Sequence, residues 1–186
     1  MKMLRAVASV AVTALCAVVL GGGAVAESFS PYVDDKGKIS IPKDFRSWYF
    51  LGAWGVATDE EGKVGSQGIH NVYTQPNTVE VFRKTGKFPD GAVLVKELLN
   101  AKTDGMTTGR ISYATETEGW FIMIKDTEDR FKGNKLWGRG WGWSLFKADD
   151  PTKTVTDNFK ADCIPCHVPA RKNDWIYVRG YPVLKN

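Results

Sequence analysis

The sequence predicts an α+β fold that is mainly β, with an antiparallel sheet and a few short helices. Its apolar and aromatic residues fall into short stretches that are separated by glycine, proline and polar turns. These stretches have strand length, and no long helix is expected after the first 26 residues. Removing those 26 residues from 186 leaves 160, which is enough for one domain with a substantial core.

Residues 1–26 have the pattern of a secretory signal peptide. Two basic residues near the start precede an uncharged apolar run, 6–20, and a stretch of small residues that ends at Ala26. The apolar run is too short for a membrane span, and no later stretch qualifies as one. Cleavage after Ala26 would discard Cys16, and we expect the mature domain, 27–186, to be periplasmic.

The first half of the mature chain is expected to form strands around one clear helix. Proline at the start and glycine just after the end are typical of a helix, and Pro-Asp-Gly is typical of a turn. The expected elements are a brief strand at 39–41, a short helix near 44–47, a strand at 48–54, a loop at 57–68, a strand at 69–74, a helix from Pro76 through Lys84 that stops at Gly86, and a turn at 89–91.

The second half continues with strands and turns. Expected are strands at 92–99, 110–115, 119–125, 137–146 and 175–183, a polar loop at 102–108, and a segment at 154–159 that leads into a short helix. Within 137–146, Gly138, Gly140 and Gly142 alternate with larger residues. Such spacing leaves one strand face bare, so that a strand, a helix or a flat ligand can approach closely.

The motif Cys-Ile-Pro-Cys-His, from Cys163 to His167, is the attachment signature of c-type haem. A helical turn places Cys163, Cys166 and His167 on one side, so that the thiols can bind the vinyl groups and His167 the iron. A thioredoxin-like redox pair would need a βαβ neighbourhood, which the pattern lacks. A structural zinc site would need four ligands, and the two cysteines and two histidines that remain after export include no second close pair. We therefore expect one covalently attached haem c, with His167 as its metal ligand.

Composition limits the partners. Loss of Lys2 and Arg5 with the signal peptide reduces 25 basic residues to 23, against 21 acidic ones. This balance predicts neither nucleic acid nor an anionic membrane as a partner. Seven tryptophans and nine phenylalanines supply large flat surfaces that could enclose a macrocycle, although most of them are expected to be ordinary core.

Five blocks of the sequence carry a resemblance to a known family. They are IPKDFRSW from Ile41, HNVYTQP from His70, RKTGKFPDGAVLVKELL from Arg83, IKDTEDRF from Ile124, and CIPCH followed by RGYPVL from Arg179. From about Lys38 onward the chain resembles the cytochrome P-460 family, which includes the β-sheet cytochromes c′. The resemblance implies a five-stranded antiparallel sheet, one covalent haem and a homodimer. Its members oxidise hydroxylamine or bind nitric oxide at a five-coordinate iron.

Lys96 stands where hydroxylamine-oxidising members have a lysine bound to the haem edge. Independently, strand alternation puts Lys96 on the same face as Leu94 and Leu98. If this face is inward, burial disfavours the charged ammonium and gives a more nucleophilic amine. Alternatively, the face of Val93 and Val95 is the buried one, or Lys96 extends to the rim.

Phe121 occupies the place where the resemblance implies a carboxylate over the iron in hydroxylamine-oxidising members. Phenylalanine cannot act as a base, but it can cap the iron and leave space for a small uncharged ligand. Glu116 and Glu118 are close in sequence and would need a register shift to reach the same site. Phe121 could also be plain core.

Five further residues, of three types, could contribute to the site. His70 could give a proton or hydrogen bond to a bound ligand, act as a sixth iron ligand, or be an ordinary strand histidine. Arg139 and Arg179 could pair with haem propionates. Met106 and Met123 are the possible soft axial ligands.

Three functions follow as hypotheses. The first is a cytochrome that binds a small diatomic or nitrogen-oxide ligand at an apolar, five-coordinate haem. The second is a hydroxylamine-oxidising enzyme with a lysine–haem cross-link. The third is a six-coordinate electron-transfer cytochrome that acts with a redox partner protein.

Overall fold

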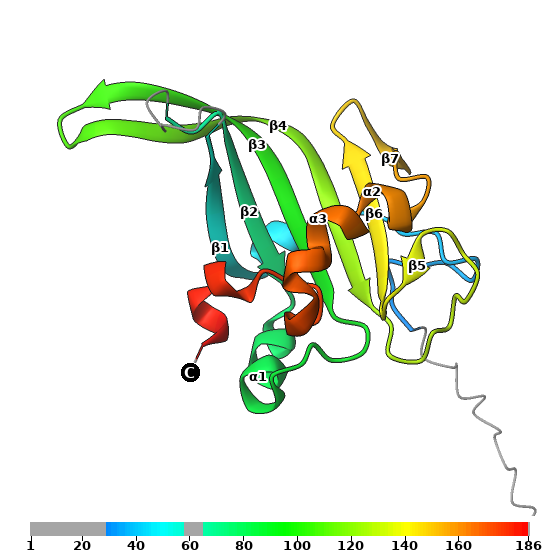
Figure 1. Ribbon diagram of the computed structural model, residues 1–186. Coiled ribbons are helices and arrows are strands. Elements are labelled where there is room, and N and C mark those ends of the chain that lie inside the picture. Colours follow the sequence, from blue (N-terminus) through cyan, green and yellow to red (C-terminus); the bar gives the residue numbers. More distant parts are fainter. Residues whose placement is uncertain (1–28, 58–64, 186) are drawn as a thin grey trace, which may run out of the picture.

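The computed structural model describes residues 29–57 and 65–185 (Figure 1). The predicted signal peptide, including Cys16, and most of the predicted loop at 57–68 lie outside these residues. Within the described part of the chain, no helix is long and apolar enough to cross a membrane.

One antiparallel sheet organises the molecule, as the predicted fold class requires (Figure 1). Its strand order is β1-β2-β3-β4-β6-β5, and β7 pairs with β6. The described residues form seven strands where the resemblance implied five, because β5 and β7 are short additions at one edge. The strands are β1 (Tyr49–Val56), β2 (Gly68–Thr74), β3 (Val93–Met106), β4 (Gly109–Lys125), β5 (Trp137–Gly138), β6 (Trp141–Lys147) and β7 (Asp150–Thr154).

Helices are short and lie outside the sheet. The longest, α1, begins with a proline and ends at Gly86, whose φ of 70° is the left-handed conformation that glycine adopts readily. The predictions of this helix, of a short helix after Asp44 and of the strands β1 and β2 are confirmed. The helices are η1 (Phe45–Ser47), α1 (Pro76–Thr85), α2 (Phe159–Asp162), α3 (Ile164–His167), η2 (Val168–Asn173), η3 (Val178–Gly180) and η4 (Pro182–Leu184).

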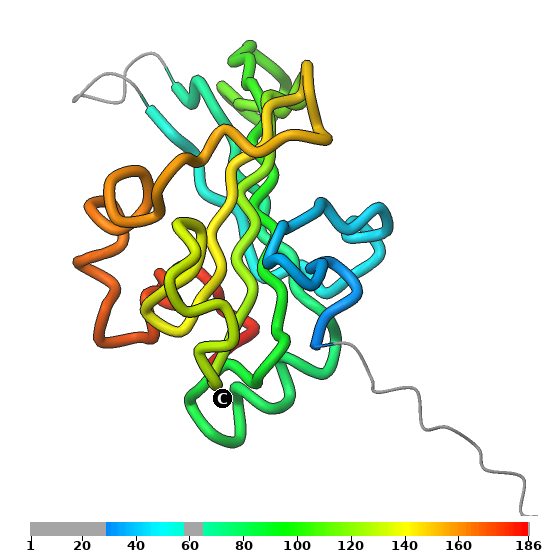
Figure 2. The backbone as a smooth tube through the Cα atoms, turned by 90° about the vertical axis from the view of Figure 1, so that its right-hand side faces the viewer, coloured from blue at the N-terminus to red at the C-terminus, as the bar shows by residue number. Residues whose placement is uncertain are grey.

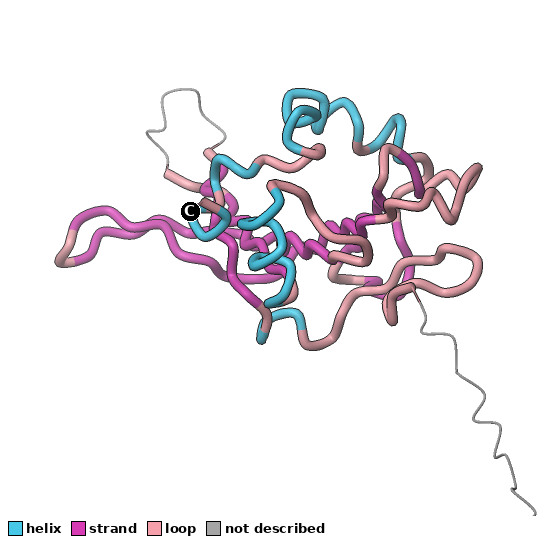
Figure 3. Tube along the Cα trace, turned by 90° about the horizontal axis from the view of Figure 1, so that it is seen from below, coloured by secondary structure: helices cyan, strands magenta, loops and turns pink. Residues whose placement is uncertain are grey.

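The strands β3 and β4 form a hairpin whose outer half projects beyond the rest of the sheet (Figures 1 and 3). The predicted polar loop at 102–108 and the break between 115 and 119 are wrong, because pairing continues to Met106 and Gly109. Residues in the projecting half are mostly exposed on both faces. They therefore lack the apolar alternation by which strands are recognised in a sequence.

Two other predicted strands are also wrong in extent. The stretch 137–146 is divided by a two-residue turn in which Arg139 and Gly140 have φ values of 61° and 78°, the geometry of a tight hairpin. The stretch 175–183 forms the 3-10 helices η3 and η4 rather than a strand. At 39–41 only an isolated bridge forms, between Val33 and Ile39.

The sheet is covered on both faces (Figure 2). One face packs against the N-terminal segment, and that core includes Ile39, Phe45, Val93, Val95, Ile122, Ile124, Trp137 and Phe146. The other packs against α1 and the C-terminal segment, and its core includes Leu51, Val72, Val79, Phe88, Leu94, Met123, Trp141, Trp143, Phe159, Ile176 and Tyr181. Both faces of β3 are therefore buried, since its alternate residues belong to the two cores.

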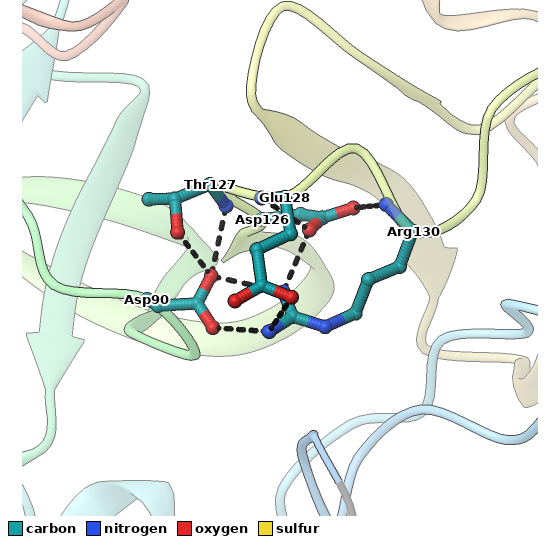
Figure 4. Close-up of polar contacts among 5 residues, drawn as sticks. All are labelled: Asp90, Asp126, Thr127, Glu128 and Arg130. Atoms are coloured by element: carbon teal, nitrogen blue, oxygen red, sulfur yellow. Dashed lines mark hydrogen bonds and ion pairs between the residues drawn. The ribbon is translucent and has the colours of Figure 1, made fainter.

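A polar cluster joins the turn before β3 to the loop after β4 (Figure 4). Arg130 bonds to Asp90 and to Asp126, each at 2.8 Å, and lies 3.1 Å from Glu128. The backbone and hydroxyl of Thr127 also donate to Asp90. The cluster fixes one end of the β3–β4 pair beside the sheet.

Candidate functional site

Cross-strand registry builds one wall of the site. Val72, Lys96 and Phe121 lie directly opposite one another on β2, β3 and β4. Because side chains alternate with a period of two, the neighbouring rows on this face pair His70 with Leu98 and Thr74 with Leu94. The sheet therefore presents aromatic and aliphatic side chains around a single lysine.

The C-terminal segment forms the opposite wall. Asn158 caps α2 by accepting a hydrogen bond from the backbone of Lys160, at 3.0 Å. The ring of Phe159 packs so closely on Gly138 that a Cβ there would lie 2.3 Å from it. The bare strand face predicted at Gly138 thus lets α2 approach the sheet. Cys163 follows α2, and α3 carries Cys166 and His167 along the cavity.

A cavity of about 570 Å³ lies between these walls. This volume falls within the range of roughly 300–1,000 Å³ that is usual for cofactor and ligand sites. The lining includes Trp54, His70, Val72, Leu94, Lys96, Phe121, Met123, Trp143, Asp162, Cys163, Cys166, His167, Ile176, Tyr177, Arg179 and Tyr181. It brings together most of the residues that the sequence analysis assigned to a haem site.

The imidazole of His167 has a defined orientation. Its Nδ1 lies 2.6 Å from the carbonyl oxygen of Trp175, which can only accept, so Nδ1 carries the proton. The ring packs edge-on against Trp143 and Tyr177, with centroids 4.9 and 5.9 Å away. Burial lowers the pKa of His167 and keeps the ring neutral. Its Nε2 lone pair is therefore available to a metal.

The two thiols differ in exposure. Cys163 is buried, and burial raises the pKa of its thiol to about 11, whereas Cys166 is exposed. Tyr177, the residue before η3, donates a hydrogen bond to the carbonyl oxygen of Cys166 and so connects η3 to α3. Two free thiols, an oriented imidazole and an apolar cavity fit a haem. Among residues 29–57 and 65–185, no group of three His, Cys, Asp or Glu side chains is placed so that it could hold a metal ion.

Lys96 points into this cavity. Its Nζ lies 4.5 Å from the centre of the Phe121 ring, a cation–π distance. Burial lowers the pKa of Lys96, and the nearby Cys166 and Cys163 partly offset this decrease. Lys96 thus lies on the cavity face with Leu94, the first of the two faces considered from the sequence.

Some of the remaining predicted residues line the cavity, and others lie outside it. His70, Met123 and Arg179 line the cavity. Burial and the neighbouring Lys96 lower the pKa of His70, although Glu118 acts in the opposite sense.

Other predicted residues lie elsewhere. Arg139 lines a second, more polar cavity, and its guanidinium is 5.8 Å from the Trp175 ring. Met106 is 51% exposed near the tip of the projecting hairpin. Glu116 and Glu118 are exposed, and Glu118 pairs with Lys147 at 3.2 Å. None of these four residues is part of the cavity lining.

The sequence analysis did not identify the tryptophans that pack around the site. Trp54 packs against Gly180, where a Cβ would lie 2.0 Å from the indole, and Trp143 packs against His167. The carbonyl of Trp175 is a backbone group, so no side-chain pattern could reveal it. A glycine in the RGYPVL block was the one sequence signal of the close approach at Trp54.

Comparison with protein families gives one match. The family model for Cytochrome P460 matches residues 42–178, which include the sheet and the Cys-x-x-Cys-His motif. A search of curated proteins finds no match.

Proposed function

The chain belongs to the cytochrome P460 family of haem-binding cytochromes, and on this premise we propose that it is an exported mono-haem c-type cytochrome that binds small nitrogen ligands such as nitric oxide. The haem would be held covalently by Cys163 and Cys166, with His167 as the axial ligand of a five-coordinate iron. A bound haem supplies an iron site for a diatomic ligand and one-electron chemistry. We further propose a periplasmic homodimer.

The sheet wall of the cavity carries this proposal. Phe121, with Val72, Leu94 and Met123, covers the side across the cavity from α3. Such a surface excludes water and favours a small uncharged ligand. Among the described lining residues, the only carboxylate is Asp162, which adjoins Cys163 in the C-terminal wall. The sheet wall therefore offers no carboxylate base for the oxidation of hydroxylamine.

Hydroxylamine oxidation remains a second candidate because of Lys96. Its amine lies inside the cavity, and burial lowers its pKa, which increases the neutral, nucleophilic fraction. These two features suit a bond to the edge of a haem. A six-coordinate electron-transfer cytochrome would instead use His70 or Met123, which line the cavity, as an additional ligand.

The test is expression of the whole chain in a host that matures c-type cytochromes, followed by mass spectrometry of haem peptides. We expect one haem on the peptide of Cys163 and Cys166, a free Lys96 peptide, and a high-spin ferrous spectrum that changes on addition of nitric oxide. A haem-bound Lys96 peptide with turnover of hydroxylamine would favour the second candidate, and a low-spin spectrum the third. A colourless product would overturn haem attachment; the double variant Cys163→Ser/Cys166→Ser is the colourless control.

A further inference from the structure

Two consecutive residues after η2 adopt a left-handed backbone. Asp174 and Trp175 have φ values of 56° and 68°. Aspartate tolerates this region, but a bulky side chain such as tryptophan rarely adopts it, because the Cβ crowds the backbone. Strained residues of this kind persist only where their surroundings hold them, and they are common at functional sites.

Buried contacts from the sheet hold this segment. The ammonium of Lys125, at the end of β4, lies 2.7 Å from Asp174 Oδ1, and its side chain is only 11% exposed. The indole of Trp141 on β6 donates to the backbone oxygen of Asp174 at 3.0 Å and approaches Oδ1 at 3.3 Å. The ammonium also lies 4.9 Å from the Trp141 ring. Asp174 is thus anchored through both its side chain and its backbone.

The backbone that follows this anchor faces the haem motif. The carbonyl oxygen of Trp175 lies 2.6 Å from Nδ1 of His167, while the amide of Trp175 donates to Ala170 at 3.1 Å. The carbonyl belongs to the residue immediately after the anchored aspartate. Its position relative to the imidazole is therefore set by the two left-handed residues.

We propose that the Lys125–Asp174 ion pair is a positioning device for the iron-binding imidazole, acting through the Trp175 carbonyl. The pair holds the strained segment, the carbonyl accepts from Nδ1–H, and this bond fixes the tautomer and the rotation of the His167 ring. A well-placed acceptor also makes the imidazole a stronger electron donor to iron. The inference rests on the haem attachment proposed above. It also gives a role to Lys125 of the IKDTEDRF block, which does not line the cavity.

Two variants remove the anchor from opposite sides. Asp174→Gly keeps the left-handed backbone without steric cost but deletes the carboxylate. Lys125→Met removes the cation and leaves the segment itself unchanged. Lys147→Met is the matched control, because it removes a lysine from an exposed ion pair with Glu118 on the same sheet.

The holoproteins are compared by resonance Raman spectroscopy of the ferrous iron–histidine stretch and by redox titration. We expect both variants to shift the stretch to lower wavenumber and to raise the reduction potential, with Lys147→Met like the wild type. Carbon monoxide binding rates should change by roughly tenfold, which is the lower end of the range of effects seen when an outer-shell contact to a metal ligand is lost. A merely structural pair would alter thermal stability but leave the stretch and potential unchanged.

The outcomes separate this inference from the proposed function. Haem peptides of normal mass together with an unchanged stretch in Asp174→Gly would overturn the positioning role while haem attachment stands. A wild-type protein without haem would overturn both. If Lys125→Met fails to fold, Asp174→Gly alone decides, since Asp174 is only partly buried and glycine keeps the left-handed backbone.

Discussion

Phe121 is the residue on which the choice of ligand depends. Replacing it with glutamate would place a carboxylate in the cavity beside the Lys96 ammonium and admit water. We expect the affinity of the ferrous protein for nitric oxide to fall at least about tenfold, which is about 1.4 kcal/mol. Stopped-flow measurement of association and dissociation rates gives this affinity.

The control for this substitution is Phe121→Leu, which keeps the wall apolar. Its affinity should not fall. If the glutamate and leucine variants bind nitric oxide equally well, Phe121 does not face the bound ligand, and the gas-binding proposal loses its main support.

The protonation of His70 should make the folding stability depend on pH. Burial, and next the neighbouring Lys96, lower the pKa of His70 below its ordinary value of 6.5. Below that value the unfolded chain takes up a proton more readily than the folded protein, so folding stability falls as pH decreases through this window. His70→Gln should therefore lose less stability between about pH 7 and about pH 5 than the wild type.

Urea unfolding at several pH values measures this difference between slopes. The two slopes should differ between about pH 7 and about pH 5 and should coincide at pH values well above this window. Equal slopes across the whole range would mean that His70 titrates normally in the folded protein.

For single residues, the sequence predicted those features of the site that depend on the spacing of neighbouring residues. Cys163, Cys166 and His167 were recognisable because the haem signature is a contiguous pattern. Lys96 was placed on a face by alternation alone, although which of the two faces was buried could not be decided, since both are. The Lys125–Asp174 contact joins residues 49 positions apart, and nothing in either neighbourhood indicates the other.

Among the elements, the loop after β4 depends on Arg130. Its guanidinium bonds to Asp126, whose side chain is 4% exposed, and to Asp90 (Figure 4). Arg130→Met would leave the Asp126 carboxylate buried without its partner. We expect a loss of about 2 kcal/mol in unfolding free energy, less than for a fully buried pair because Arg130 is partly exposed.

Denaturant unfolding tests this against Lys147→Met, which breaks an exposed pair and should cost less than about 1 kcal/mol. Similar losses in the two variants would show that the Arg130 cluster contributes no more than a surface ion pair. The cluster would then not fix the end of the β3–β4 hairpin.

Element prediction succeeded where a boundary residue has a fixed backbone role and failed where the tertiary environment decides. Pro76 and Gly86 bound α1 correctly because proline and glycine set the backbone by themselves. The outer half of β3 was missed, and β4 was predicted only as two pieces, 110–115 and 119–125, because polar residues there face water on both sides. The stretch 175–183 is rich in aromatic and branched residues, yet Gly180 must approach Trp54, and a 3-10 helix results.

At the scale of the whole molecule, the described residues form one sheet with a core on each face. The N-terminal core joins the sheet to the segment of Ile39 and Phe45 by direct side-chain packing. The C-terminal core borders the cavity of about 570 Å³, so part of each of its walls faces the cavity rather than the other wall. A haem tethered there would complete this core, because its flat surfaces would pack against the cavity lining only when the chain is folded.

Loss of the haem should therefore unfold one side of the molecule before the other. In Cys163→Ser/Cys166→Ser we expect amide hydrogen exchange to rise by at least about tenfold in the segment 159–184. The centres of β3 and β4, at Val95 and Ile122, should keep their protection, because their side chains pack into the N-terminal core. Peptide-resolved exchange of the variant and the holoprotein measures both regions. A uniform rise across the sheet would mean that the two cores unfold as one unit, and that the haem supports the entire fold rather than the face it binds.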